Sequence, residues 1–385
     1  MKKRYVAVLS AIVTAFSPVA SFGADESTVS ETAVSDEQNQ QTDLTEQFST
    51  FITSQYDEEL ETLTFDDAVE KALRNNSSLN NLKASMDIAE TQLEIQYLEA
   101  YSSEDGFSGL ISFLNSQSSY QNSELSIVAQ EESVKHSMKQ SYINIIELQR
   151  NIALSELALK NDELNLALSK IKLSNGKISQ SEYDNLNLAY NTAKEQLETQ
   201  KDTLEMEYVS LNILMGTDIN KRYNFVMDAV YEPFELDIPV ESYINGKVAL
   251  SNSVRQAEKS YETTKQTSKL TPLNSSEIGS YQSAQNSLNS AEMSYEDAKD
   301  SVYESLYQKY NSIVQEEKDY TAGLDELKLL QNEFERVQVK YLSGNASYYE
   351  LLTAQYNVAE KENTLLSSVY SHMLLSEELT NTELM

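Results

Sequence analysis

Several residue types that build common functional sites are missing or scarce in this chain. It contains no cysteine, which excludes disulfides, thiolate metal sites, cysteine nucleophiles and a lipid anchor on an N-terminal cysteine. Its only histidines are His136 and His372, which are too few for a histidine-based metal or acid–base site. The sequence also lacks a glycine-rich phosphate loop and a nucleophile with a histidine nearby. We therefore expect neither an enzyme nor a cofactor.

Positive charge is scarce as well. Lys and Arg number 29 against 61 Asp and Glu, and the formal net charge is −32. Such a surface repels the phosphates of nucleic acids and anionic lipid headgroups, so we expect no nucleic-acid partner.

Long apolar runs are absent after the first residues, so no later segment resembles a transmembrane helix. The start itself has a basic segment (2–4), a short apolar segment (5–16) and a small-residue stretch (21–24). This pattern predicts a signal peptide at 1–24 and therefore an exported protein. Residues 25–58 are acidic and polar, and we expect a disordered linker there. Folding is expected to begin at Thr64, the N-cap of a helix.

Proline and glycine are rare, with 4 and 9 residues, and this predicts long helices. Between Gly109 and Gly176 the chain has neither. A continuous helix of that length would extend roughly 100 Å at about 1.5 Å per residue. An elongated bundle or tube accommodates such a helix, whereas a compact domain does not.

Apolar residues in this stretch recur every seven positions, as in coiled coils. A second seam of Leu157, Leu164 and Ile171 runs beside the first, which predicts helix neighbours on both flanks. A shift of 168 positions brings the first seam back in the second half of the chain. The paired seams are Met138, Ile145, Ile152, Leu159, Leu166 and Leu173, and Leu306, Ile313, Tyr320, Leu327, Phe334 and Tyr341.

The same shift superimposes two glycine turns, each followed by Ser-x-x-Glu. Glycine tolerates the positive φ that ends a helix. Ser-x-x-Glu before an apolar run predicts a capping box that starts the return helix. The two sets are Gly176, Ser179 and Glu182, and Gly344, Ser347 and Glu350. The chain is therefore predicted to be a duplicated long helical hairpin.

We expect an all-α fold of long antiparallel coiled-coil helices in two tandem repeats. The first hairpin repeat is placed at 59–216 and the second at 246–385. Residues 217–245 mix β-branched, aromatic and proline residues, which predicts an extended linker with one or two short strands. A new helix is expected near Val240–Gly246. His372 lies in the seam register and is expected to pack in the interior, while His136 receives no role.

The order of these motifs resembles the TolC-like outer-membrane efflux family. The resemblance rests on residues 63–76, where a hydroxyl-capped helix contains Ala-Leu-x-x-Asn, and on 211–216, Leu-x-x-Leu-x-Gly. The two glycine turns with Ser-x-x-Glu resemble that family's hairpin tips. The resemblance covers nearly all of residues 60–380.

The resemblance implies a homotrimer whose protomers close into an α-helical tunnel and dock on a periplasmic adaptor and an inner-membrane transporter. It places adaptor contacts at the tips and an acidic ring at the aperture, for which Glu182 and Glu350 are the candidates. The residues also support a simpler interpretation, in which both glutamates only cap helices. The implied tip contacts are Asn175, Gly176, Lys177, Ser343, Gly344 and Asn345.

The chain departs from the family where barrel strands would be inserted, at 101–126 and 266–290. Neither stretch shows the alternating segments of about ten residues that such strands need. We expect loops or short helical turns there, and little or no β-barrel, so contact with an outer membrane stays open. Two functions follow as hypotheses: a passive envelope conduit of an efflux or secretion system, or a structural coiled-coil spacer or adhesin without channel activity.

Overall fold

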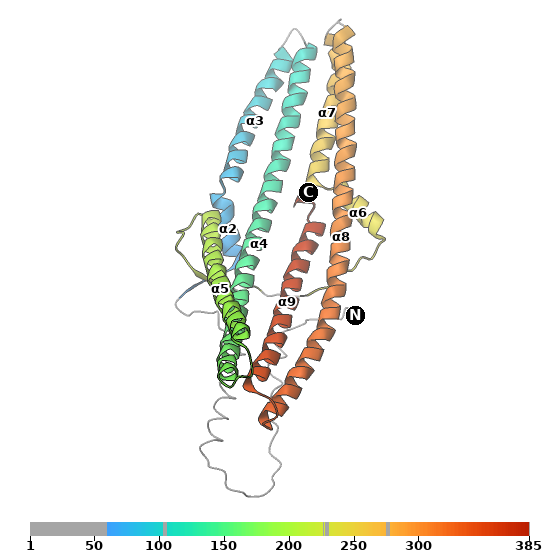
Figure 1. Ribbon diagram of the computed structural model, residues 1–385. Coiled ribbons are helices and arrows are strands. Elements are labelled where there is room, and N and C mark those ends of the chain that lie inside the picture. The colour runs from blue at the N-terminus through green and yellow to red at the C-terminus, as the bar shows by residue number, and fades with distance from the viewer. Residues whose placement is uncertain (1–59, 103–105, 226, 228–230, 275–277, 385) are drawn as a thin grey trace.

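The computed structural model describes residues 60–102, 106–225, 227, 231–274 and 278–384 (Figure 1). The predicted signal peptide and acidic linker lie outside these residues. Helices make up most of the described chain. The order is β1 (Glu61–Leu63), α2 (Phe65–Asn75), α3 (Ser77–Ser102), α4 (Gly106–Ser174), α5 (Gln180–Met215), β2 (Tyr223–Phe225), α6 (Val240–Val248), α7 (Asn252–Asn274), α8 (Ile278–Leu342), α9 (Tyr348–Thr380) and the 3₁₀ helix η2 (Thr382–Leu384).

The long helices form an elongated row rather than a compact body (Figure 1). In the upper part of the view the row runs α3, α4, α7, α8, and in the lower part it runs α5, α4, α9, α8. The two longest helices, α4 and α8, therefore belong to both halves. Helix α9 packs against both α4 and α8 and so joins the two hairpins.

The absence of helix-breaking residues explains the lengths of α4 and α8, which have 69 and 65 residues. At about 1.5 Å per residue each spans roughly 100 Å. The expectation of loops or short helical turns at 101–126 and 266–290 was wrong, because the described residues there belong to the helices α3, α4, α7 and α8. The side chains are rich in Ser and Asn, which are weak helix formers, and helix-on-helix packing outweighs that preference.

The heptad seams form the core of each hairpin, as predicted. Met138 and Ile145 in the first repeat, and Leu306 and Ile313 in the second, are completely or almost completely buried. Burial decreases along each seam toward the glycine turns, where the last seam residues are only half-buried. The lower ends of the helices thus have fewer neighbours within one chain than the middle has.

A small sheet at the middle of the molecule was predicted only in part. The expected strand in the linker is β2, and it pairs in parallel with β1 from the start of the described chain. Tyr142 of α4 fixes this sheet: its ring contacts Phe65 and Phe225, and its hydroxyl donates to the Leu63 carbonyl at 2.7 Å. The predicted N-cap Thr64 is confirmed, since its side chain accepts a bond from the Asp67 N–H.

The linker then crosses to the second hairpin. The Phe234 N–H donates to Glu317 on α8 at 2.6 Å, and the Tyr231 ring stacks on Tyr320 with centroids 4.1 Å apart. His372 of α9 lies against the same Glu317 carboxylate at 3.1 Å and is 4% exposed. The interior position predicted for His372 is therefore confirmed, with a polar partner that the sequence did not indicate.

Among the helices of the described residues, none has an apolar stretch of the length and composition that a bilayer span requires.

Candidate functional site at the hairpin turns

The two glycine turns are nearly identical in geometry and lie at the same end of the molecule (Figure 1). Gly176 and Gly344 have φ values of 69° and 73°, in the left-handed region. In each turn the glycine N–H donates to a carbonyl of the preceding helix at 2.9 Å, and the N–H of the next residue donates to another at 2.8 Å. These bonds satisfy carbonyls at the end of the helix that have no partner within it. A Cβ at either glycine would meet nothing within 4 Å, so the backbone angle rather than space requires glycine.

Each return helix begins with the predicted capping box. Ser179 Oγ accepts from the Glu182 N–H at 3.2 Å, and Glu182 Oε2 accepts from the Ser179 N–H at 2.7 Å. Ser347 and Glu350 repeat this arrangement with the same distances. The box closes the first turns of α5 and α9 and fixes the angle at which each helix leaves the turn.

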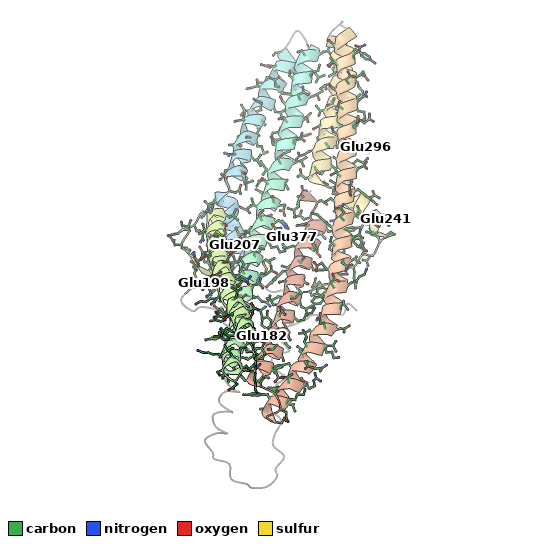
Figure 2. All side chains as sticks on the ribbon, in the orientation of Figure 1. Glu182, Glu198, Glu207, Glu241, Glu296 and Glu377 are labelled. Atoms are coloured by element: carbon green, nitrogen blue, oxygen red, sulfur yellow. The ribbon has the colours of Figure 1, made fainter. Side chains whose placement is uncertain are left out.

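The capping bonds also set the charge of the two glutamates. The bond from the Ser179 backbone N–H, followed by that from its hydroxyl, lowers the pKa of Glu182. The same two bonds from Ser347, with a smaller contribution from Lys340, lower the pKa of Glu350. Both carboxylates are exposed and hold their negative charge at the start of a helix, where the helix dipole favours it. Figure 2 shows Glu182 at the lower end of α5.

Basic side chains also lie near both turns of this acidic chain. Lys170, Lys172 and Lys177 surround the first turn, and Arg336 and Lys340 precede the second; all five are exposed. Lysines in the last turn of a helix favour its negative end. Carboxylates lie at the same end, and Arg336 pairs with Glu333, so the tips carry charges of both signs.

Exposed apolar side chains lie beside these lysines, and sequence reasoning missed them as a surface. Ile171 and Leu188 near the first turn are 59% and 65% exposed, and Val339 and Leu342 near the second are 68% and 61% exposed. The heptad pattern contained Ile171, but a pattern alone does not show which seam lacks a partner. The tips thus combine apolar, basic and capping residues on one end of the molecule.

The seam between the two hairpins is polar, in contrast to the apolar seams within them. The Asn363 side-chain amide donates to Asn151 Oδ1 at 2.7 Å, and the Asn161 side-chain amide donates to Thr353 Oγ1 at 3.0 Å. Lys139 pairs with Glu377, which Figure 2 marks on α9. These partners lie more than 190 positions apart in sequence, so no local pattern predicts them.

Charged groups are also enclosed at this seam. Burial lowers the pKa of Arg150 on α4 and raises the pKa of Glu362 on α9, and the two interact electrostatically. His136, which received no role from the sequence, pairs with Glu378 at 3.0 Å. The interface between repeats therefore relies on hydrogen bonds and charges, which specify a register more strictly than apolar contacts do.

The described residues hold no group of three or more His, Asp or Glu side chains placed to bind a metal ion. The sequence-predicted site residues at the two turns are brought to one end of the row, while the two turns remain separate structures on different helix pairs (Figure 1).

Comparison with known proteins finds similar solved structures but no matching family model or curated protein. No protein-family model matches the sequence, and no curated protein matches it either. Among solved structures, CusC is similar over 84% of this chain and 92% of its own, with 14% identity and a TM-score of 0.63. The outer membrane protein VceC of Vibrio cholerae is similar over 82% and 95%, with 12% identity and a TM-score of 0.58.

A third structure, the CmeC outer membrane channel of Campylobacter jejuni, is similar over 83% of this chain and 85% of its own, with 14% identity and a TM-score of 0.58. At such identities the likeness establishes the fold. The chain has the fold of the TolC-like channels, built from two tandem helical hairpins. Of these similar structures, CusC forms a transmembrane channel and CmeC is an outer membrane channel.

Proposed function

We propose that this chain is the exported conduit component of an efflux or secretion system in the cell envelope. The observation that carries the proposal is the TolC-like row of long helices with both hairpin turns exposed at one end. A passive conduit needs a closed wall and a docking end. The outer flanks of the row would close the wall by contact between copies, and the turns would form the docking end.

The outer flanks support assembly of several copies into a ring. On α5, the exposed residues Leu188, Met206 and Ile213 lie on the face opposite the seam that packs on α4. On α8, Leu329 and Val339 occupy the corresponding outward face. Two different flanks on one molecule form a head-to-tail contact, which generates a ring when the rotation closes. Three copies are the number that the TolC resemblance implies.

The turns support docking on an adaptor that connects to an inner-membrane transporter. Asn175, Lys177 and Asn345 project from turns that capping boxes and left-handed glycines hold rigidly, and exposed apolar residues flank them. Rigid tips with apolar and charged groups suit a protein partner, because little order must be gained on binding. Glu182 and Glu350 then have a capping role, and in a ring they add an acidic collar near the aperture.

Mass measurement in solution tests the ring. Light scattering on residues 25–385, purified without detergent, is expected to give three times the monomer mass. A clean monomer contradicts the tunnel and leaves the spacer hypothesis.

A transport measurement tests the conduit. Deletion of the gene is expected to raise retention of a fluorescent efflux dye, and the wild-type chain is expected to restore export. Lys177→Glu with Asn345→Asp should not restore it, whereas Gln196→Glu, on the exposed middle of α5, should. If the protein is a trimer but deletion of its gene leaves dye retention unchanged, the structural spacer is favoured. The observation that supports a spacer is the helical state of the upper hairpins, α3 with α4 and α7 with α8.

A further inference from the structure

The dipeptide Asn-Gly occurs twice in the chain, and a lysine follows it each time. The first copy is Asn175-Gly176 in the turn between α4 and α5, and the second is Asn245-Gly246 in α6. An asparagine before glycine readily loses its side-chain amide, because glycine has no side chain to hinder attack by its own backbone nitrogen. All four residues are exposed, so the two copies differ mainly in the backbone that holds them.

The loss of the amide at the first copy needs no reactant except water. The Gly176 nitrogen gives its proton to solvent and attacks Asn175 Cγ, so that a new C–N bond closes a succinimide ring. The bond between Cγ and Nδ2 breaks, and Nδ2 takes up a proton and leaves as ammonia. Water then opens the ring at one of its two carbonyls. Opening at Cγ gives aspartate, and opening at the backbone carbonyl gives isoaspartate, in which the chain runs through Cγ.

The first copy lies at a helix end that opens without disturbing the core. The Gly176 N–H donates to the Leu173 carbonyl at 2.9 Å, and the Lys177 N–H donates to the Lys172 carbonyl at 2.8 Å. A Cβ on Gly176 would meet nothing within 4 Å, so side chains from elsewhere in the described chain do not crowd this position. Rare fraying of this end is enough to free the nitrogen for attack.

The second copy is held by buried neighbours. Ile244 directly precedes Asn245 and is completely buried, and Val248 is 6% exposed; both belong to the core that α6 shares with α8. Gly246 lies inside α6, where its N–H takes part in the helical hydrogen bonds. To free this nitrogen, α6 must unwind and withdraw Ile244 from the core, which costs more free energy than fraying a helix end.

The second hairpin turn lacks the reactive pair. The shift of 168 positions that superimposes the two turns places Ser343 where the first turn has Asn175, and serine has no amide to lose. Asn345 follows Gly344 instead of preceding it, and the next residue, Ala346, carries a methyl group that hinders attack. The reaction would therefore mark the first turn and leave the second unchanged.

We propose that Asn175 is a site of spontaneous deamidation, so that the first hairpin turn gains a negative charge as the folded protein ages. The new carboxylate lies between Lys172 and Lys177 in the sequence, and both lysines are exposed. Isoaspartate also lengthens the backbone inside the left-handed turn. The chemical change is independent of the conduit, whereas its effect on docking at this turn rests on the proposed function.

Peptide mass spectrometry tests the site. The full chain is incubated for increasing times in mildly alkaline buffer without denaturant, then digested with pepsin in acid, where the attack is slow. We expect Asn175 to lose its amide at least about tenfold faster than Asn245, which corresponds to about 1.4 kcal/mol in the free energy of local opening. Equal rates at the two sites, or faster loss at Asn245, overturn the proposal.

The same incubation in concentrated urea is the matched control. Both sites are then unfolded copies of Asn-Gly-Lys, so their rates should become equal. A difference that persists in urea comes from the flanking residues Ser174 and Ile244 and contradicts the role given to the fold. Asn175→Gln should abolish the more acidic species that anion exchange separates from aged wild type. If that species forms at an unchanged rate in the variant, the modified residue is not Asn175.

Dye export separates the effect on docking from the conduit itself. In a strain that lacks the gene, Asn245→Asp is expected to restore export as the wild type does, whereas Asn175→Asp is expected to restore only part of it. Full export with Asn175→Asp overturns the effect on docking and leaves the deamidation site intact. If the wild-type chain restores no export, the conduit fails, and the rates at Asn175 and Asn245 still decide the site.

Discussion

At the scale of single residues, the left-handed glycines decide where each hairpin turns back. A side chain at positive φ clashes with its own backbone, and neither Gly176 nor Gly344 has a neighbour that a methyl group would touch. Any cost of substitution at these positions therefore comes from the backbone angle alone.

We expect Gly176→Ala to lower the free energy of unfolding by about 1–2 kcal/mol. Gly246→Ala is the matched control, because Gly246 lies inside α6 with open space around its Cα and an ordinary φ. That variant should gain about 0.5–1 kcal/mol from helix propensity. Urea unfolding followed by circular dichroism measures both, and equal effects would contradict the role of the turn angle.

The two capping glutamates predict a pH dependence. Their folded-state pKa values are lowered, so they stabilise the fold above the unfolded value of about 4.3 and lose that contribution as pH falls through the folded value. The double variant Glu182→Gln/Glu350→Gln should thus be less stable than the wild type at neutral pH, and the difference should vanish in acid.

Unfolding midpoints measured from neutral pH to about pH 3 test this expectation. Glu195→Gln, on the exposed middle of α5, removes a like charge without touching a cap and serves as the control. A difference between wild type and the double variant that persists in acid would show that carboxylate charge is not what the caps use.

At the scale of elements, the upper hairpins depend on how closely their helices approach. A Cβ on Gly109 of α4 would lie 2.8 Å from the Ala100 Cα of α3, closer than atoms can come without the backbone moving. Gly279 near the start of α8 has nothing within 4 Å of the same position. The backbones of α3 and α4 are therefore in close contact at Gly109, whereas Gly279 faces open space.

We expect Gly109→Ala to destabilise the chain by about 1–3 kcal/mol despite the better helix propensity of alanine. Gly279→Ala should be neutral or stabilising by up to about 1 kcal/mol. Hydrogen exchange over α3 and α4 locates the effect, and faster exchange confined to α5 instead would show that the close approach is not the cause.

At the scale of the whole molecule, the outward seams of α5 and α8 should control assembly rather than folding. Met206→Asp places a charge on the exposed seam of α5, where a second copy would have to desolvate it. We expect that variant to keep its helix content and to lose the trimer mass. Light scattering and circular dichroism on the same sample measure both.

Gln196→Glu adds charge to α5 away from that seam and should stay trimeric. Loss of the trimer in both variants would point to net charge, which is already strongly negative, rather than to the seam.

Sequence alone determined the features that depend on neighbours a few positions apart. The capping boxes, the glycine turns, the Thr64 cap and the heptad seams follow from local hydrogen bonding, backbone angle and helical period. The duplication follows from comparing one local pattern with another. Because such rules act within one or two helical turns, they can be read from residue order.

Tertiary structure alone decided which helices become neighbours. The helical state of the Ser- and Asn-rich stretches at 106–126 and 278–290, the pairing of β1 with β2 and the polar seam of Asn151 with Asn363 all join residues far apart in the chain or of weak local preference. Their outcome depends on packing and on the satisfaction of buried polar groups, which are properties of the assembled fold. The exposed seams on α5 and α8 likewise became visible only once their neighbours were placed.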